Sequence, residues 1–316
     1  DYADVINYYA GMMLDDADLI GKLQDRILPY LSSHSDLGNL FEVDSIKLEL
    51  GIPEDQVKTT IASTKQLSTE EKDTLTDTPD TSESYAPTKC KANIHYNENM
   101  TFALTVELLG RVLKSSEELE NVTKQEALQI FISSCLVLWK QFRESVLSFA
   151  SKINEEILAS QKEDSNESLK DSMDKAYSDF CDILKLCVPL AMSSFIFECV
   201  GTEKMRLIFN DYYSKQSYSS PEKLLLLMLL CDLKVPGWAA KLQDYIKNTS
   251  KKDFLWVIFF KCQYCLQFNY FGAETPKIIE PMAECYIKVN SLNKLAKSKI
   301  IGELSQKTRL LDNKKE

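Results

Sequence analysis

The sequence is poor in the two residue types that end strands and form tight turns. Glycine and proline occur nine times each in 316 residues, against averages of roughly 7% and 5%. A sandwich or barrel with many strands needs such residues at its turns, so their scarcity argues against an all-β fold. It also argues against the glycine-rich loops that hold phosphate groups in nucleotide-binding proteins.

Histidine is scarcer still, with His34 and His95 as its two occurrences. Histidine is the most frequent general acid or base in enzymes, and neither residue lies in a catalytic motif; HExxH and GxSxG do not occur. One CxxC pair, Cys262 and Cys265, has no second pair at zinc-ligand spacing. On a helix these thiols share a face with apolar residues, so we expect core packing rather than metal or redox chemistry. The sequence predicts no enzyme, no cofactor and no small-molecule substrate.

Long apolar runs are absent as well. No stretch of 18 apolar residues occurs, and no basic segment precedes an apolar one near the start, so we expect neither membrane insertion nor a targeting signal. The nine cysteines fall mostly within apolar helical patterns, which is typical of reduced, buried thiols. We therefore expect a cytoplasmic or nuclear protein. Because the chain begins with Asp1 rather than Met, we expect it to be a fragment of a longer protein.

The sequence does contain a long series of helical patterns. The strongest begins at a capping box, Thr123 with Glu126, and repeats apolar residues at helical spacing for about thirty residues, from Leu128 to Ile157. Shorter patterns follow Gly201, separated by turns of a few residues. They predict helices near 203–217, 221–234, 237–248, 252–271, 276–289 and 292–311.

Turns this short make successive helices pack antiparallel. The predicted fold class is therefore all-α, either an irregular α-solenoid, that is a HEAT-like stack of helical hairpins, or an extended helical bundle. Two hairpin starts, near Ser219 and Ser250, lie about thirty residues apart, which suits a stack of repeats. The repeat hypothesis rests on this spacing, since no consensus repeat motif occurs.

Composition divides the chain into three parts. Residues 1–65 hold several short helical patterns and predict a small N-terminal helical cluster. Residues 66–97 are rich in Ser, Thr, Asp and Glu with hardly any large aliphatic residue, which is typical of a linker or a long surface loop. Residues 98–316 predict the main domain of antiparallel helix pairs.

One segment of the main domain is apolar on more than one helical face. The segment 254–271, FLWVIFFKCQYCLQFNYF, places aromatic residues around the whole helix. Such a helix is usually buried between others; the alternative is that part of its surface docks a partner chain. In that case the candidate partner-binding residues are Trp238, Trp256 and Tyr270.

Charge is distributed unevenly along the chain. Residues 1–100 carry 19 acidic and 8 basic side chains, whereas residues 241–316 carry 8 acidic and 14 basic ones, in a chain of net charge −10. A basic C-terminal surface could bind nucleic acid or another anionic partner; the alternative is an ordinary solvated helix. The candidate residues for this role are Lys294, Lys297, Lys299, Lys307 and Arg309.

These observations support one main hypothesis and two rivals. The main one is a non-catalytic helical scaffold or adaptor subunit of a larger intracellular complex, which binds other protein subunits through helix faces. The first rival is a nucleic-acid- or chromatin-associated helical module that uses the basic C-terminal face. The second is an enzyme with an unusual carboxylate or thiol site, which would need a pocket with strongly perturbed titratable groups.

Overall fold

The computed structural model confirms the all-α class: the described residues form helices and no strand. The structure describes residues 17–37, 40, 98–116, 119–160, 167–267, 271–292 and 297–312. Within these ranges, the backbone alone is described at positions 156–160, 167–174, 179, 182, 184, 267 and 306–312. The α-helices are α2 (Ala17–Ser33), α5 (Glu98–Ser115), α6 (Asn121–Ser160), α7 (Glu167–Val200), α8 (Arg206–Lys215), α9 (Pro221–Asp232), α10 (Trp238–Asn248), α11 (Lys252–Gln267), α12 (Pro276–Val289) and α13 (Lys297–Asp312), with 3-10 turns η2 (Glu203–Met205) and η3 (Gly272–Glu274).

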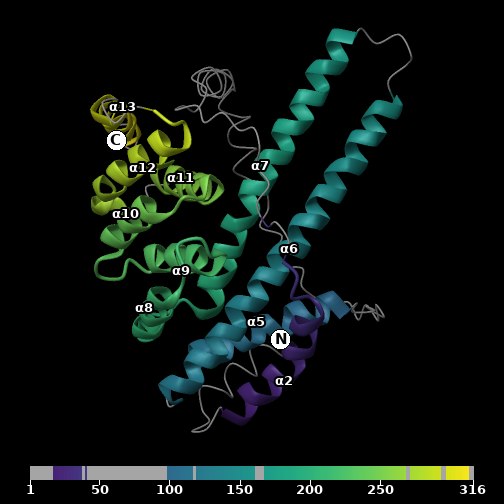
Figure 1. The fold of residues 1–316 in the computed structure, drawn as a ribbon, viewed down its shortest axis with the longest axis vertical. Helices are drawn as coiled ribbons and strands as arrows, with labels where there is room; N and C mark the ends of the chain where they lie inside the picture. The colour runs from purple at the N-terminus through teal and green to yellow at the C-terminus, as the bar shows by residue number, and fades with distance from the viewer. Residues whose placement is uncertain are drawn as a thin grey trace, which may run out of the picture. The chain divides into compact units, whose positions relative to one another are not determined.

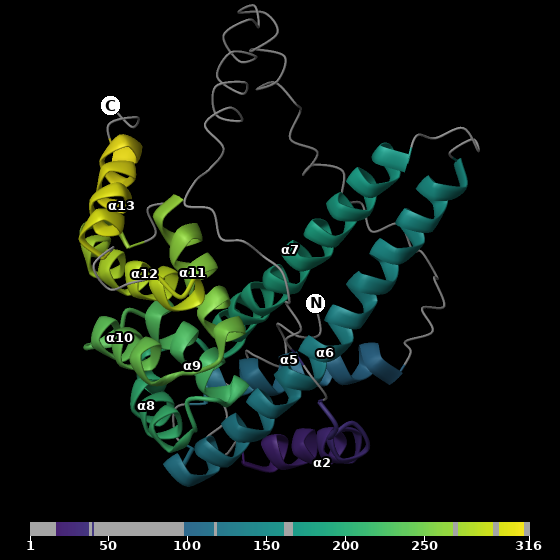
Figure 2. The ribbon, with the colours of Figure 1, turned by 45° about the horizontal axis from the view of Figure 1, so that its top comes forward.

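Two long antiparallel helices, α6 and α7, run side by side through the molecule (Figures 1 and 2). With 40 and 34 residues, they are about 60 Å and 50 Å long at 1.5 Å per residue. Phe131 of α6 stacks on Phe195 of α7, with ring centroids 6.3 Å apart. The pattern from Leu128 to Ile157 lies in one continuous helix, as its spacing predicts. The predicted start at a Thr123–Glu126 capping box is wrong, because the helix begins at Asn121 and Thr123 lies within its first turn.

Helix α2 packs against α5 and α6. Tyr30 of α2 donates a hydrogen bond to Asn99 of α5 and accepts one from Gln141 of α6, while its ring stacks on Phe102 at 4.1 Å. Helix α2 thus belongs to the same compact unit as the helices that follow residue 98. The three-part division into 1–65, 66–97 and 98–316 stays a prediction, because most of its first two parts lies outside the described residues.

Helices α8 to α13 follow one another through short connections, close to the positions predicted for them. Ser220 begins α9 by accepting a hydrogen bond from the Lys223 amide at 3.2 Å, and Pro221 occupies the first turn. Helix α9 packs against α7, α8 and α10. Every residue from Lys223 to Asp232 is buried as a result.

Among the described residues, no single helix is long and apolar enough to cross a membrane. One pair, Lys185–Val200 with Glu203–Lys215, meets the length and composition criterion together but is bent by 95°.

Gly110 of α5 lies directly against both α6 and α7. A Cβ atom at this position would lie 2.6 Å from Cε2 of Phe131 and 2.7 Å from Cβ of Cys199, so both neighbours would have to move. A glycine inside a helix lowers stability by roughly 0.5–1 kcal/mol relative to alanine, and close helix packing is the reason to have one here.

We expect Gly110→Ala to destabilise the fold by about 1–3 kcal/mol, because the added methyl overpacks a helix crossing. Gly21→Ala is the matched control: it lies inside α2, where a Cβ would meet nothing within 4 Å, so it should stabilise by roughly 0.5–1 kcal/mol. Urea denaturation of both variants measures the difference. Equal effects of the two substitutions would contradict the packing described for Gly110.

Candidate partner-binding surfaces

One face of α6 is apolar along most of the helix but is buried along its first half alone. Its residues recur every three or four positions: Phe131, Cys135, Trp139, Phe142, Val146, Phe149 and Ile153. The first three are buried completely, whereas Phe142, Phe149 and Ile153 are 47%, 67% and 39% exposed. We call these last three side chains the α6 stripe.

The α6 stripe begins where the helices that cover α6 end. Gln141, the residue before the stripe, is bound to Tyr30 near the end of α2, and Tyr30 is bound to Asn99 at the start of α5. Lys140 donates a hydrogen bond to the Asp36 carbonyl at 2.7 Å. Beyond this point α7 still accompanies α6 (Figures 1 and 2), but Phe149 remains exposed.

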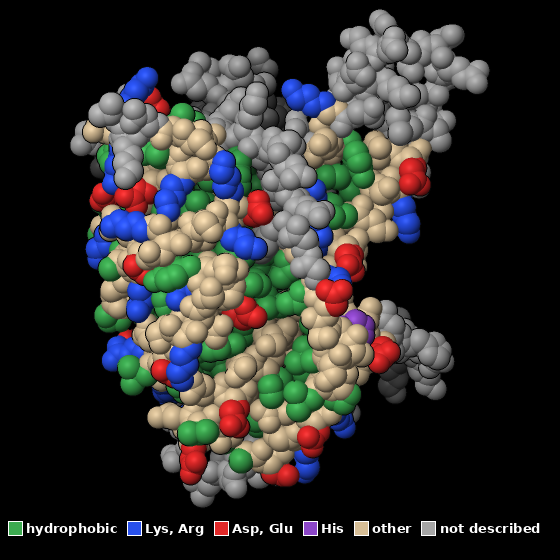
Figure 3. Space-filling model, in the orientation of Figure 1, with side chains coloured by type: hydrophobic (Ala, Val, Ile, Leu, Met, Phe, Trp, Pro, Cys, Tyr) green, Lys and Arg blue, Asp and Glu red, His purple; other side chains and the backbone are tan. Residues whose placement is uncertain are grey.

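Helix α7 carries an exposed face of its own. Its members again recur every three or four residues and are all exposed: Phe180, Ile183, Cys187, Ala191, Ser194 and Glu198. The face changes along the helix from apolar at Phe180 and Ile183 to polar at Ser194 and Glu198. Figure 3 shows hydrophobic side chains at the surface of the hairpin.

A groove of about 330 Å³ lies at the polar end of this α7 face. Ser194, Phe197 and Glu198 of α7 form one wall, and Tyr264 and Cys265 of α11 form the other. A groove of this size is at the lower end of the range of about 300–1,000 Å³ for ligand sites.

A buried ion pair lies in the groove. Nζ of Lys261 donates a hydrogen bond of 2.9 Å to Oδ2 of Asp232 and is 2.9 Å from Oδ1; Ser193 donates a third, longer bond of 3.3 Å. Burial raises the pKa of the Asp232 carboxyl, although the bonds from Lys261 and Ser193 oppose this. Burial by itself would lower the pKa of Lys261. The attraction and hydrogen bond of the Asp232 carboxylate have the larger effect, so the pKa of Lys261 is raised. The pair links α9, α11 and α7.

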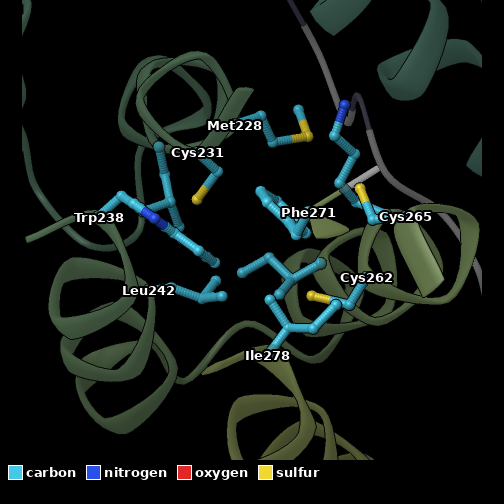
Figure 4. A pocket seen from close by; sticks show the side chains of 11 residues that line it. Met228, Cys231, Trp238, Leu242, Cys262, Cys265, Phe271 and Ile278 are labelled. Carbon is cyan, nitrogen blue, oxygen red and sulfur yellow. The ribbon is translucent and has the colours of Figure 1, made fainter. Parts of the chain in front are cut away.

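A second, smaller cavity is surrounded by apolar side chains of α9, α10, α11 and α12 (Figure 4). Trp238 and Phe271 stack beside it with centroids 4.6 Å apart. Its volume of about 20 Å³ is close to the space for one water molecule, about 10–15 Å³. The cavity is therefore a packing gap rather than a ligand site.

The aromatic candidates from the sequence lie elsewhere. Trp238 and Trp256 are 3% and 5% exposed and contribute to the core, and Tyr270 lies outside the described residues. Their role in partner binding stays a prediction. Among the described residues, the exposed aromatic side chains include Phe142, Phe149, Phe180 and Tyr264.

The structure describes some of the basic residues that the sequence suggested for binding an anionic partner. Lys297 binds two carboxylates of α12, Glu280 at 2.7 Å and Glu284 at 3.1 Å, so its charge is matched locally. Lys299 is exposed, Lys294 lies outside the described residues, and positions 307 and 309 are described by their backbone alone. On the face shown in Figure 3, basic side chains predominate over α10 to α13, with acidic side chains among them.

No group of three or more His, Cys, Asp or Glu side chains in the described part of the chain is arranged to hold a metal ion. Cys262 and Cys265 are buried. Burial raises the pKa of the Cys265 thiol to about 11 and raises that of Cys262 as well. Both thiols are therefore protonated at neutral pH, and a protonated thiol is a poor nucleophile and metal ligand.

No known protein family, curated protein or solved structure matches the chain.

Thiol accessibility gives a first test of this arrangement. Under native conditions iodoacetamide should modify the exposed Cys187 at least ~10-fold faster than Cys262 or Cys265, because buried, protonated thiols react through local opening. Peptide mass spectrometry after timed labelling measures the three rates, and labelling in urea should make them equal. A fast-reacting CxxC pair would contradict the core assignment.

The ion pair gives a second test. Lys261→Met leaves the Asp232 carboxylate buried without its partner and should lower the free energy of unfolding by about 3–5 kcal/mol. Adding Asp232→Asn should restore part of the loss. Lys215→Met removes the exposed pair with Asp211 and should leave the urea midpoint nearly unchanged; similar losses in both lysine variants would refute a special role for Lys261.

Proposed function

We propose that this chain is a non-catalytic helical scaffold or adaptor subunit of a larger intracellular complex, and that the α6–α7 hairpin binds a partner protein. The observation that carries the proposal is the α6 stripe: Phe142, Phe149 and Ile153 continue a buried helix face into solvent. A single exposed apolar residue needs no explanation, but three exposed residues on one face of a helix, with the half-buried Val146 among them, form an apolar row. Such patches commonly mark protein interfaces.

The chemistry of the stripe also favours a protein partner. Aromatic side chains are enriched in the buried centre of interfaces, while charged residues are depleted there. Phe149, which is the most exposed member, has Glu144, Lys152 and Glu155 exposed on the same helix. Lys152, three residues after Phe149, borders it on the helix surface.

We also propose that α8 to α13 form a short, irregular stack of helical hairpins. Packing between consecutive helices supports it, since α8 contacts α9, α9 contacts α10, α11 contacts α12 and α12 contacts α13. Further contacts of α10 with α12 and of α7 with α11 depart from a regular solenoid. The reduced cysteines support the proposed location in cytoplasm or nucleus.

The alternative of a nucleic-acid-binding module has weaker support. It needs a row of available cations on α13, and Lys297 is already held by Glu280 and Glu284. Exposed Lys299 would have to act with residues that are described by their backbone alone or not at all.

The α6 stripe can be tested with one substitution and a matched control. Phe149→Gln keeps a good helix former and, at an exposed site, should change stability by less than about 0.5 kcal/mol. Leu207→Gln removes another apolar side chain, 73% exposed on α8. The tagged chain, purified from nuclease-treated extract, should retain stoichiometric protein partners in the Leu207 variant and lose at least one in the Phe149 variant.

Two outcomes would overturn the proposal. Identical partner sets from the parent chain and the Phe149 variant would show that the stripe does not bind. Recovery that disappears with nuclease or at raised salt would favour the nucleic-acid alternative, because phosphate contacts are strongly salt-dependent.

A further inference from the structure

The α6 stripe and the half-buried Val146 follow the spacing of a seam between two packed helices. Phe142 and Phe149 lie seven residues apart, as do Val146 and Ile153, and the steps from one member to the next alternate between four and three residues. In a heptad written abcdefg, this spacing places Val146 and Ile153 at position a and the two phenylalanines at position d. Side chains at a and d insert between those of a facing helix, so the row has the form of a helix-binding surface.

Helix α7 runs beside α6 (Figures 1 and 2) but does not cover this row. Ser151 of α6 interacts with Tyr177 of α7, and residue 151 occupies heptad position f. At 3.6 residues per turn, position f lies on the side of a helix opposite to a and d. The row therefore faces away from α7 at this level, which is why the α6 stripe is exposed.

Helices already cover the first half of the same face. Gly110 of α5 lies against Phe131, and α2 is hydrogen-bonded to Gln141. The remaining row, from Phe142 to Ile153, rises by about 17 Å, or about three turns. One short helix is therefore enough to continue the cover along α6.

Two cations border the row, one on each side. Arg143 at position e lies three residues before Val146, and Lys152 at position g lies three residues after Phe149. Neither cation is paired with a carboxylate in the described part of the chain. The edges of the row therefore carry positive charge that is not neutralised, in contrast to Lys261 and Lys297.

The neighbouring carboxylates of α6 lie away from these edges. Glu144 and Glu155 occupy positions f and c, and Glu155 accepts a hydrogen bond of 3.2 Å from Ser151. Glu156 takes the next d position in the sequence and ends the apolar row. The local charge is thus opposite in sign to the net charge of the chain, which is −10.

We propose that the α6 stripe binds an amphipathic α-helix of a partner protein that carries acidic residues beside its apolar face. Residues at e and g form salt bridges between paired helices and set the choice of partner. Arg143 and Lys152 therefore select a helix with Glu or Asp at the facing positions, and Phe149 packs near the centre of the contact. The inference rests on the proposed function, because it names the kind of protein that binds the α6 stripe.

The probe is a designed peptide of three heptads with leucine at every a and d, alanine at b, c and f, and glutamate at every e and g. Its matched control has lysine at e and g, and like charges at these positions oppose self-pairing of either peptide. Fluorescence anisotropy of the labelled peptides with the full chain measures both affinities. We expect the glutamate peptide to bind at least ~5-fold more tightly. Nonspecific attraction to an acidic chain would give the opposite order.

Variants locate the site. The double substitution Arg143→Gln with Lys152→Gln should abolish the preference for the glutamate peptide, whereas Lys247→Gln, which removes an exposed cation of α10, should preserve it. Phe149→Gln should weaken binding of the glutamate peptide at least ~10-fold, because central aromatic residues provide much of the binding energy. Leu207→Gln should leave that affinity unchanged. Unchanged thermal midpoints would show that each variant remains folded.

Three results would overturn the inference. The first is no binding of the glutamate peptide, and the second is equal affinity for both peptides. The third is self-association of the parent chain, measured by sedimentation, that Phe149→Gln abolishes, since a second copy would then cover the row. Failure of the proposed function looks different: the Phe149 variant then keeps every cellular partner, whatever the peptides do. Loss of a partner in that variant together with equal peptide affinities would retain the α6 stripe and reject the acidic helix.

Discussion

The packing of α5 and α2 on the first half of α6 is the contact on which the other features depend. Helix α5 has 18 residues and is about 27 Å long, whereas α6 is about 60 Å long. The shorter helix cannot cover the longer one, and the bonds of Tyr30 to Asn99 and Gln141 show where the cover ends. The apolar face of α6 continues past that point, so Phe142, Phe149 and Ile153 are exposed by a mismatch of lengths.

The C-terminal helices follow a different constraint. Helix α9 is buried along nearly all its residues and α11 along most of them, which leaves few positions for polar groups. Asp232 and Lys261 are therefore paired with each other, and Ser193 supplies a further bond. A buried charge without a partner is strongly unfavourable, so this pair restricts how α7, α9 and α11 can be arranged.

Much of the fold could be predicted because it depends on local chemistry. Helical spacing and the scarcity of glycine and proline reflect local chemistry, and they predicted an all-α chain with one very long helix, although the Thr123–Glu126 pair did not mark where that helix begins. The core assignment of Cys262 and Cys265 was likewise accessible, because two thiols one turn apart share a face with apolar neighbours. The burial of Trp256 agrees with the interpretation that a helix apolar on more than one face lies between others. The location of Trp238 was not accessible, since an aromatic residue has the same spacing in a core as on a docking surface.

The sequence by itself determined which segments are helical and which of their faces are apolar, because both follow from residue type and the period of the helix. Tertiary structure alone decided which apolar faces are covered. Phe131 and Phe149 belong to one face of one helix. Helices α5 and α2 cover α6 as far as Gln141, so Phe131 is buried and Phe149 is exposed. Lys297 is a similar case: its charge is a property of the sequence, but its neutralisation by Glu280 and Glu284 depends on how α13 packs on α12. A helix face is covered by segments that are distant in the sequence, and no local pattern of residues encodes that contact.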